Sequence, residues 1–403
     1  MKILVIVGEC IQTNTSANLC HLAYIRGLID LGHNVVLLSG DGRDYSLDPN
    51  MTIPKEVEHH TYYGVSLYEK MSLRKKTSPS QASVSALPAS TEDQRIGITR
   101  RIKNAILSLY GVHGIYATFV RKAQKFRSDI DFDYVLSIST PVTSHLLAHN
   151  LLKAKHIKAK HWIQIWEDPW HSDVYGFNGA ENIRKEERRL LSFAEKVCYV
   201  SPLTLKNQQA KYAESAHKMY WQPLPFYYKS DDTRAASDTQ NRYGYFGAYS
   251  PAARNIIPFY EAAVSCNINV NICGDPAGLL SPTDKIRISG RLSLDKLKPI
   301  EDSTNVLIFL CNRKGGQIPG KIYQYSATDK TILFIMDGTD EEQRVLREYF
   351  GKFNRYVFCR NTKEDIIRAI QQIESGDLGA VRNRPLDDFD PKITISNILK
   401  AGS

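Results

Sequence analysis

The sequence predicts an α/β protein built from two Rossmann-like domains that face each other across a cleft. Short apolar, β-branched runs alternate with helix-length amphipathic segments, which is the pattern of a parallel, doubly wound sheet. The alternation stops at a polar stretch, residues 229–241, and then begins again. The length of 403 residues exceeds the ~250–300 residues at which one hydrophobic core stops growing. Two domains are therefore expected.

The first domain opens with a strand at 2–7, a helix whose apolar face runs from Leu19 to Leu28, and a second strand at 34–38. Later segments continue the alternation, with strands at 134–138, 161–166 and 196–200 and helices at 142–153 and 182–194. We assign residues 1–228 to this domain. A segment rich in Ser and Ala, 77–91, has the composition of a flexible loop inside it.

The same pattern returns after the linker at 229–241. Strands are expected at 243–247, 269–273, 285–288, 305–310 and 332–335, and helices at 256–264, at 320–327 and after 362. The second domain spans 242–385, and the tail at 386–403 is expected to pack back on the first domain. Ligands of parallel sheets bind at the carboxyl ends of the strands, so the functional residues should lie in the loops that follow them.

Several classes of protein are disfavoured by simple patterns. The turn after the first strand has one glycine, Gly8, whereas a dinucleotide site needs three and a P-loop needs Gly-Lys-Ser/Thr. Seven cysteines without a Cys-x-x-Cys pair indicate reduced, buried thiols. The Asp-x-Asp triplets at 131–133 and 388–390 do not follow strands, so they are interpreted as solvated turns and no metal is predicted. No apolar run approaches the ~20 residues of a membrane span, and Glu9 comes too early for a signal peptide, so the chain is expected to stay in the cytoplasm.

Hydroxyl groups follow two strands of the first domain. Thr13 and Ser16 lie in the loop after the first strand, where they either contact a substrate or belong to an ordinary capped loop. Thr140 follows the strand at 134–138 and is placed to cap the next helix, with Pro141 at its first position. Capping alone explains Thr140, and a place in the cleft is the functional alternative.

Residues 162–171 combine aromatic rings with carboxylates at the end of a strand. Three of the four Trp residues of the chain fall here. Glu167, Asp168 and His171 follow the strand directly, beside Trp170. Carboxylates accept hydrogen bonds from sugar hydroxyls, and an indole ring covers the apolar face of a sugar. The segment therefore predicts a carbohydrate site, and the alternative is a rim of core aromatic residues with solvated acids.

A basic, glycine-rich loop follows the most apolar strand of the second half. Its cations, and the backbone N–H groups before the next helix, suit a diphosphate group. An arginine in the loop after 243–247 adds a guanidinium that can hold phosphate with two hydrogen bonds. The candidate residues are Gly247, Arg254, Lys314, Gly316, Gly320 and Lys321. A solvated loop with a glycine hinge is the alternative.

The net charge of +9 comes from one part of the chain. Residues 70–127 hold 12 Lys or Arg against two acids, a net charge of +10, so the remainder is close to neutral. Apolar residues interleave with these cations at helical spacing, which is typical of a helix lying on an anionic membrane surface. A solvated basic face packed on the domain is the alternative. No recognised motif supports nucleic-acid binding, so no nucleic-acid partner is expected.

Three motifs occur in a familiar order and spacing. Ser-Ile-Ser-Thr-Pro at 137–141 and Trp-Glu-Asp-Pro-Trp at 166–170 are similar to the paired signature S-T-S-P-P and F-R-D-P-W. Residues 186–201 resemble E-R-x-L followed by A-D-x-V-x-x-V-S, and residues 319–327 resemble P-x-K-x-Y-E-Y-L-A. Together they resemble the retaining GT-B glycosyltransferases of family 4, which build bacterial surface polysaccharides. The likeness spans nearly the whole chain except 77–91.

The resemblance implies a GT-B fold and a nucleotide diphosphate sugar as donor, with neither a metal nor a separate cofactor. The second domain would bind the donor. The first would bind a lipid-linked or oligosaccharide acceptor in capsule or O-antigen synthesis, docked by residues 70–127 on the inner face of the cell membrane. Asp168, with Glu167 and His171, would contact the sugar or orient the acceptor, and the acceptor side of the cleft would include Thr13, Ser16, Thr140 and Trp170. The chain departs from the family at Gln324, where members carry a glutamate that hydrogen-bonds the nucleotide ribose.

Two further functions share these features. A nucleotide-sugar 2-epimerase has the same double architecture, although it should offer more paired acids and histidines in the cleft. A non-catalytic peripheral-membrane subunit of a polysaccharide assembly complex fits Gln324 and the basic segment equally well. Hydrolysis of a nucleotide sugar without acceptor would distinguish both from a transferase.

Overall fold

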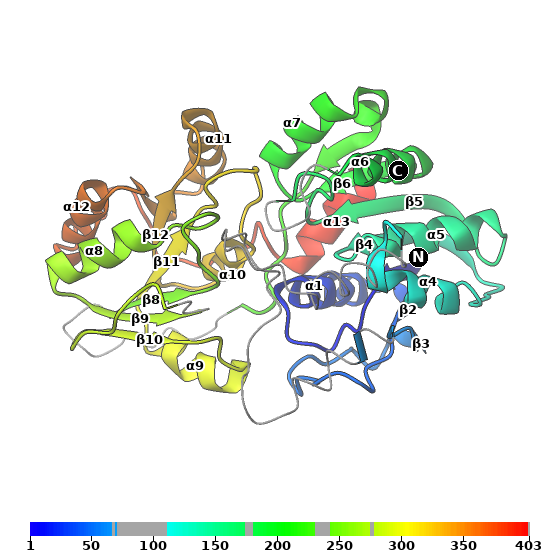
Figure 1. Cartoon of the computed structure of the whole chain (residues 1–403), viewed down its shortest axis with the longest axis horizontal. Coiled ribbons are helices and arrows are strands. Elements are labelled where there is room, and N and C mark those ends of the chain that lie inside the picture. The colour runs from blue at the N-terminus through cyan, green and yellow to red at the C-terminus, as the bar shows by residue number, and fades with distance from the viewer. Residues whose placement is uncertain (67–68, 71–110, 174–179, 230–241, 275–277, 402–403) are drawn as a thin grey trace, which may run out of the picture. The chain divides into compact units, whose positions relative to one another are not determined.

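A computed structural model describes the chain except for residues 67–68, 71–110, 174–179, 230–241, 275–277 and 402–403 (Figure 1). The chain divides into two compact units. The first consists of Met1–Val200, Thr204–Gln222 and Pro391–Ser403, and the second of Ser201–Leu203 and Pro223–Asp390. The expected loop at 77–91 lies outside the described residues, as does the expected linker from residue 230 onward. Within the described part, the helices are all too short or too polar to cross a bilayer.

The first unit is a seven-stranded parallel sheet in the order β3-β2-β1-β4-β5-β6-β7. Its strands are β1 (Lys2–Val7), β2 (Asn34–Gly40), β3 (Glu58–Tyr62), β4 (Asp131–Ser139), β5 (Lys158–Trp166), β6 (Lys196–Tyr199) and β7 (Met219–Trp221). Among its described residues, the α-helices are α1 (Ser16–Asp30), α4 (Ala117–Ala123), α5 (Thr143–Lys153), α6 (Glu181–Phe193), α7 (Pro202–Lys211) and α13 (Pro391–Ala401), with short 3₁₀ helices at Gly114–Tyr116 and Ala213–Lys218.

The centre of this sheet is β1, which the sequence marks as a run of β-branched and aliphatic residues. All of its side chains from Ile3 to Val7 are buried, because helices cover both faces of a parallel sheet. The last helix, α13 (red), lies beside α1 (dark blue) in Figure 1, although the two are far apart in sequence. Gly27 makes this approach possible, since an added Cβ would lie 2.5 Å from the carbonyl oxygen of Pro391.

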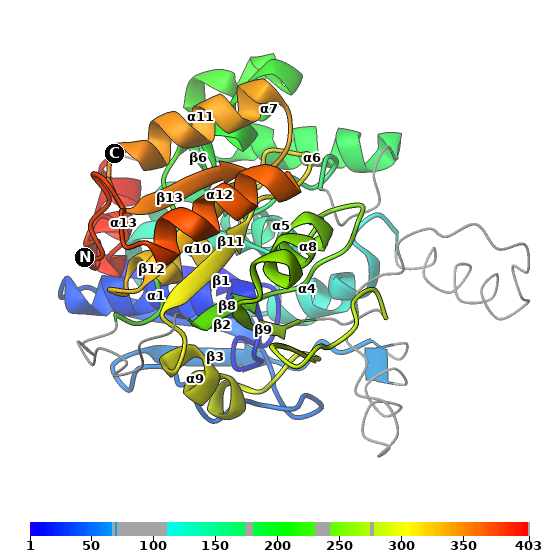
Figure 2. The same ribbon diagram turned by 90° about the vertical axis from the view of Figure 1, so that its left-hand side faces the viewer.

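The second unit is a six-stranded parallel sheet in the order β10-β9-β8-β11-β12-β13. Its strands are β8 (Arg242–Phe246), β9 (Asn269–Cys273), β10 (Ile286–Ser289), β11 (Val306–Leu310), β12 (Thr331–Met336) and β13 (Tyr356–Arg360). Its helices are α8 (Ile257–Cys266), α9 (Leu294–Asp302), α10 (Lys321–Ser326), α11 (Asp340–Gly351) and α12 (Lys363–Glu374). Figure 2 shows α8 and α12 side by side, and their apolar faces share one core with the sheet.

The boundary between the units differs from the one expected at 228. Pro223–Asp390 forms one unit because the chain entering it pairs with the chain leaving it. The N–H of Phe226 donates to the carbonyl of Phe389 at 3.0 Å, and the Phe389 ring packs edge-on against Tyr323. The expected tail at 386–403 is thus divided: its first five residues belong to the second unit, and α13 belongs to the first.

Every strand and helix expected with explicit bounds is present, with ends that shift by up to three residues. The strands that sequence reasoning missed, β3, β7 and β13, all lie at sheet edges. β7 is only three residues long, and β13 is apolar and largely buried, so a weak hydrophobic signal accounts for β3 alone. In β3 the sequence is Glu-His-His-Thr-Tyr, and none of these side chains is fully buried.

Candidate active site

The carboxyl ends of β1, β4 and β5 bring three loops of the first unit to one edge of the sheet. Val7 pairs with Ile138, and Ser139 pairs with Trp166, so the three strands end nearly level. Gly8 allows the loop after β1 to pack closely against the loop after β4. Its N–H donates to the Ser144 hydroxyl at 2.8 Å, and an added Cβ would meet Pro141 at 2.7 Å. Only glycine fits here.

A histidine and two glutamates come together at this edge. His21, on α1, is completely buried, and its Nε2 lies 3.3 Å from Oε2 of Glu167, which follows β5. Burial opposes the charge of His21, but the neighbouring Glu167 and Glu9 outweigh it and raise its pKa. Glu9, after β1, is half-buried, and burial, together with the charge of Glu167, raises its pKa to about 7. Glu167 was expected in the site, whereas Glu9 and His21 were not.

The loop that carries Asp168, Trp170 and His171 is held by a buried carboxylate. Glu187, on α6, accepts hydrogen bonds from the backbone N–H groups of Trp170 and His171 at 3.1 and 2.9 Å. It also accepts from Gln208 at 2.8 Å and from the Tyr212 hydroxyl at 2.8 Å. The four bonds fix the path of the loop after β5.

The three predicted catalytic residues, Glu167, Asp168 and His171, lie in different surroundings. His171 contacts the ammonium group of Lys211, and partial burial together with that positive charge lowers its pKa, so the imidazole is neutral at pH 7. Glu167 is buried against His21. Asp168 is half-buried beside them. The structure therefore brings the three residues to one loop, with Glu167 beside His21 and His171 beside Lys211.

The tryptophans of this segment do not act together. Trp162 and Trp166 lie in the sheet core, where their indole N–H groups donate to Ser137 and Gln164, both at 2.9 Å. The expectation that these rings belong to a carbohydrate site is wrong for both of them, because alternate residues of a buried strand face the covering helices. Trp170 is half-exposed and stacks on His113 at a centroid distance of 5.2 Å.

The predicted hydroxyl groups have mixed outcomes. Thr13 is part of the loop's own framework: its hydroxyl accepts from the buried amide of Asn18 at 2.8 Å and donates to the Cys10 carbonyl. Ser16 is exposed at the start of α1, which Thr15 caps. Thr140 is exposed and is not an N-cap, because α5 begins at residue 143, without a side-chain cap. The Pro-containing turn continues two residues further than the sequence suggested.

A pocket opens in the first unit at the ends of β1 and β2. Glu9, Asp41 and Glu69 place carboxylates in its wall, and Tyr45 and Tyr116 add phenol rings. The other lining residues are Gly8, Cys10, Gly40, Gly64, Val65 and Phe119. Sequence reasoning missed this pocket. Asp41 follows β2, which was expected, but Glu69 comes after β3, which was not.

In the second unit, the loops after β8 and β11 are tied together by side chains. Arg254 Nε donates to Oδ1 of Asn312 at 2.8 Å, and Asn312 Nδ2 donates to the carbonyl of Gln317 at 3.1 Å. A further guanidinium nitrogen donates to the carbonyl of Ala248. Arg254 stays half-exposed at the edge of the sheet. Gly247, directly after β8, lies beside it, with an added Cβ 3.8 Å from the guanidinium.

The glycine-rich loop has the backbone that its sequence suggested. Gly315 and Gly316 both have positive φ values, 97° and 73°, which favour glycine. The hydroxyl of Ser201 donates to the Gly316 carbonyl at 2.6 Å. Lys314 is exposed at the tip of the loop.

Lys321 and Gln324, on α10, are both engaged in the second unit. Lys321 Nζ lies 3.1 Å from Oε1 of Glu301 on α9. Gln324 accepts from the N–H of Tyr227 at 2.9 Å and donates to the carbonyl of Tyr228 at 2.7 Å. The helix expected at 320–327 is only six residues long, starting after Gly320.

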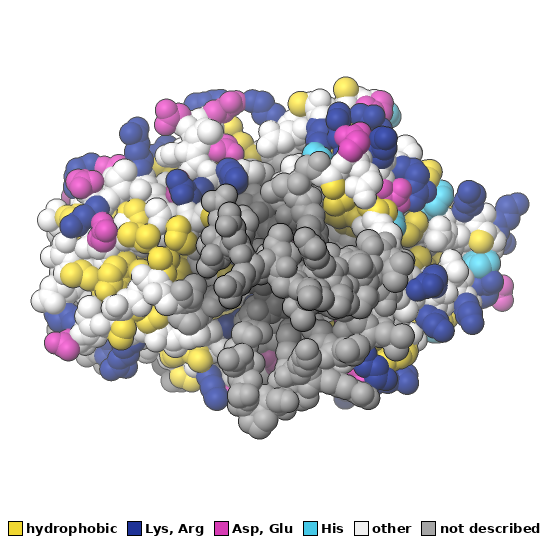
Figure 3. Space-filling model, viewed as in Figure 1, with side chains coloured by type: hydrophobic (Ala, Val, Ile, Leu, Met, Phe, Trp, Pro, Cys, Tyr) yellow, Lys and Arg dark blue, Asp and Glu magenta, His cyan; other side chains and the backbone are white. Residues whose placement is uncertain are grey.

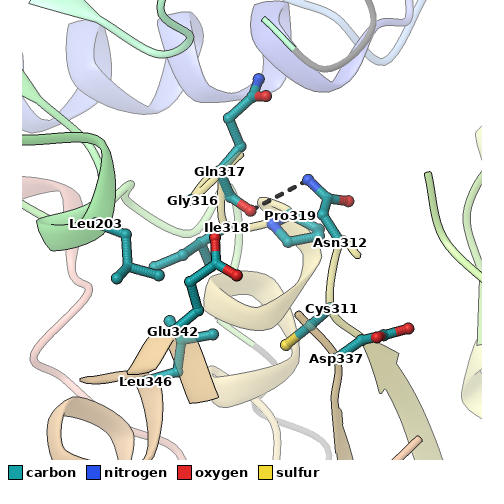
Figure 4. Close-up of a pocket in the computed structure, with 10 residues that line it drawn as sticks. All are labelled: Leu203, Cys311, Asn312, Gly316, Gln317, Ile318, Pro319, Asp337, Glu342 and Leu346. Carbon is teal, nitrogen blue, oxygen red and sulfur yellow. Dashed lines mark hydrogen bonds between the residues drawn. The ribbon is translucent and has the colours of Figure 1, made fainter. Parts of the chain in front are cut away.

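A small pocket lies beneath the glycine-rich loop (Figure 4). Cys311 and Asp337 line it at the ends of β11 and β12, and Glu342 and Leu346 line it from α11. The figure shows the side chain of Gln317 pointing away from these groups, while its carbonyl holds Asn312. Within the described ranges, no group of three or more His, Cys, Asp or Glu side chains is arranged to bind a metal ion.

No protein-family model matches the chain, and no curated protein does. Solved structures match over its full length. A sucrose-phosphate synthase from Thermosynechococcus elongatus is 12% identical with a TM-score of 0.59, covering 100% of this chain and 95% of the other. A glycosyltransferase from Rickettsia africae is 12% identical with a TM-score of 0.54, covering 100% and 94%. A structure described as trehalose-6-phosphate from E. coli bound with UDP-2-fluoro glucose is 8% identical with a TM-score of 0.53, covering 100% and 96%.

These structures show the fold of the chain. Two parallel, Rossmann-like sheets with interleaved helices, in the strand orders given above, form the GT-B architecture. The fold class expected from the sequence is therefore confirmed.

Proposed function

We propose that this chain is a glycosyltransferase that moves a sugar from a nucleotide diphosphate sugar to a hydroxyl group of a glycan or lipid-linked acceptor. The observation that carries the proposal is the brace in the second unit, where Asn312 holds Arg254 against the glycine-rich loop. A guanidinium fixed beside the backbone N–H groups of a glycine-rich loop suits a diphosphate. The similar E. coli structure is described with UDP-2-fluoro glucose bound, which is an analogue of a nucleotide diphosphate sugar.

In this proposal the second unit binds the donor. Arg254, Lys314 and Lys321 supply positive charge to the diphosphate as the bond from the anomeric carbon to its oxygen breaks. Lys321 is paired with Glu301 in the structure, so a bound diphosphate would compete with that carboxylate for it. Gln324 keeps its amide on the backbone of residues 227–228. We therefore assign it to the framework of the donor site rather than to the ribose.

The first unit would bind the acceptor at the carboxyl edge of its sheet. Asp168 would contact the transferred sugar. Its side chain is half-buried, and it lies in the loop that Glu187 fixes. The half-exposed ring of Trp170 supplies an apolar face next to it. Transfer with retention, without metal, and in the synthesis of surface polysaccharide follows from the motif resemblance alone.

We also propose that the basic segment docks the first unit on an anionic membrane, where a lipid-linked acceptor would lie. In the described part of the segment, Arg121, Lys122, Lys125 and Arg127 are all exposed. Figure 3 shows Lys and Arg side chains at the right of that view, where Figure 1 places α4. Phe119 and Phe126, which alternate with these cations in the sequence, are buried in the core, however, and do not lie beside the cations at the surface. Docking by this part would be electrostatic.

A thermal-shift screen of nucleotide sugars tests the proposal. A donor at 100 times its dissociation constant stabilises the chain by about 2.7 kcal/mol. The donor that binds is then incubated without acceptor, and release of nucleoside diphosphate is measured. Asp168→Ala should abolish turnover and leave the thermal shift unchanged. A chain that no nucleotide sugar stabilises would overturn the proposed function, and binding without turnover would favour a non-catalytic subunit.

A further inference from the structure

Glu9 occupies a fixed position at the end of the central strand of the first unit. It is the second residue after β1, and its carbonyl accepts from the N–H of Gly40 at 2.9 Å. Gly8, just before it, is locked against Pro141 and Ser144. The backbone at Glu9 is thus held by the loops after β2 and β4. A backbone that is fixed by two neighbouring loops gives its side chain a well-defined position.

The side chain of Glu9 faces the pocket of the first unit, and it differs from the other carboxylates there. Asp41 pairs with Arg43, whose Nη2 lies 2.6 Å away. Glu69 accepts from the Tyr45 hydroxyl at 2.6 Å. Among the described residues, none makes a hydrogen bond or ion pair with the carboxylate of Glu9. It is the carboxylate of this pocket with lone pairs still to satisfy.

Charged groups surround Glu9 from several elements. His21 of α1 favours its ionised form, while Glu167 after β5 and Glu69 after β3 disfavour it. Burial acts in the same direction as the two acids and is the largest cause, so the pKa of Glu9 rises to about 7. Asp41 and the phenols of Tyr45 and Tyr116 line the same pocket. A carboxylate with a pKa near the working pH is effective at accepting a proton in a transition state.

We propose that Glu9 is a catalytic residue that accepts the proton of the attacking acceptor hydroxyl. The role rests on the proposed function. The acceptor oxygen forms a bond to the anomeric carbon of the donor sugar, and its proton moves to a carboxylate oxygen of Glu9. The bond between the anomeric carbon and the diphosphate oxygen breaks, and the diphosphate leaves with the electron pair. Glu9 then releases the proton to water. The hydroxyl must lose its proton whether the anomeric configuration is inverted or retained; with retention, an oxygen of the leaving diphosphate lies on the same face and competes with Glu9 for it.

The neighbouring candidates are less suited to the role. Glu167 is buried and pairs with His21, and it is not among the residues that line the pocket. His171 is held beside the positive charge of Lys211. The charge of His21 lowers the pKa of Glu9 against the larger effect of burial, so His21 would moderate the proton affinity of Glu9 without contact with the acceptor.

The test is the pH dependence of donor hydrolysis, with water as the acceptor, using UDP-glucose, UDP-N-acetylglucosamine and GDP-mannose as probes. The variants are Glu9→Gln, Glu9→Asp and Glu9→Ala, with Glu56→Gln as a control that removes an exposed carboxylate of the same unit. We expect Glu9→Gln to lower kcat by about 100-fold or more, with the dissociation constant of the donor unchanged. The acidic limb of the rate profile near pH 7 should disappear, and formate should restore part of the activity of Glu9→Ala.

Three results decide the matter. Loss of kcat and of the acidic limb in Glu9→Gln, with donor binding and thermal unfolding as in the unsubstituted chain, supports the assignment. Full kcat with an unchanged pH profile in Glu9→Gln overturns it while leaving the glycosyltransferase proposal standing. An unsubstituted chain that neither binds nor hydrolyses any of the three probes counts against the proposed function, and the Glu9 assignment falls with it.

Discussion

The side-chain amide of Gln324 donates to the carbonyl oxygen of Tyr228 at 2.7 Å, while its oxygen accepts from the N–H of Tyr227 at 2.9 Å. The clasp ties α10, which follows the glycine-rich loop, to the chain where it enters the second unit. An ionised carboxylate could not replace the amide, because it accepts hydrogen bonds but cannot donate one.

Replacement of Gln324 by Glu should destabilise the second unit. A carboxylate cannot donate to Tyr228 and would face its carbonyl oxygen, so we expect a loss of about 1–2 kcal/mol. Urea unfolding measures the change. Gln371→Glu, on the exposed side of α12, is the matched control. Equal unfolding midpoints for the two variants would show that the clasp contributes nothing.

The stability of the first unit should fall as pH rises toward 8. Folding raises the pKa of Glu9 from 4.5 to about 7, so the folded chain binds more protons than the unfolded chain between these values. The contribution is complete below pH 4.5 and is lost as pH rises through 7. The raised pKa of His21 acts in the same direction above pH 6.5.

Glu9→Gln should remove the part of this slope that belongs to Glu9. We expect the difference in unfolding free energy between pH 5 and pH 8 to shrink by roughly 1–3 kcal/mol. Chemical denaturation at the two pH values measures it. The Glu56→Gln control should keep the original slope, and a Glu9→Gln variant that also keeps it would contradict the raised pKa.

Arg254→Ala should weaken nucleotide binding. Its guanidinium is positioned by Asn312, so Asn312→Ala should have a smaller effect of the same kind. A charged hydrogen bond contributes about 1.5–3 kcal/mol, which corresponds to a 10- to 150-fold increase in the dissociation constant of UDP or GDP. Isothermal titration measures the constant. Arg287→Ala, an exposed arginine of β10, should leave it unchanged, and equal affinities in all variants would exclude Arg254 from the donor site.

Glu187→Gln should loosen the loop after β5. The carboxylate accepts four hydrogen bonds, and an amide nitrogen placed there would face donors at 2.8–3.1 Å. We expect a loss of about 2–4 kcal/mol in unfolding free energy. Turnover should fall as well, since the loop carries Asp168. Glu181→Gln, which removes an exposed carboxylate of the same helix, serves as the control. Equal turnover in the two variants would show that the position of this loop does not matter for catalysis.

Binding to anionic vesicles should depend on the cations around α4. Neutralisation to Gln of Arg121, Lys122, Lys125 and Arg127 should reduce co-sedimentation with phosphatidylserine vesicles, because each charge near such a surface contributes about 1 kcal/mol. Added salt should have the same effect. A variant with four exposed cations of the second unit neutralised, Arg344, Lys352, Arg360 and Arg368, is the control. Equal pelleting with neutral vesicles would refute the docking proposal.

The sequence was most informative where a residue's neighbours in the chain are also its neighbours in space. The run from Lys2 to Val7 alone predicts a buried strand, and Thr362, before Lys363, is the N-cap of α12 that its position suggests. Gly315 and Gly316 likewise have the positive φ values that a glycine pair indicates. Each of these depends on backbone preferences and on periodicity over a few residues.

The candidate site needed contacts between distant segments. Glu9 and His21 meet Glu167 only because β1 and β5 end at the same edge of one sheet. Nothing in the short apolar run before Glu9 signals a raised pKa, since that depends on which groups fold around it. The position of an acid two residues after the first strand could have identified Glu9 as a candidate, but not the residues that surround it.

The sequence by itself determined the two-sheet α/β fold, the loops after strands in which we look for the site, and the concentration of positive charge in residues 70–127. The tertiary structure decided which side chains in those loops are committed to the framework, as Thr13 and Gln324 are, and that Glu9 is not bonded among the described residues. The reason is physical. A strand or helix arises from local periodicity, whereas the partners and the proton affinity of a side chain are set by residues that only the completed fold brings near.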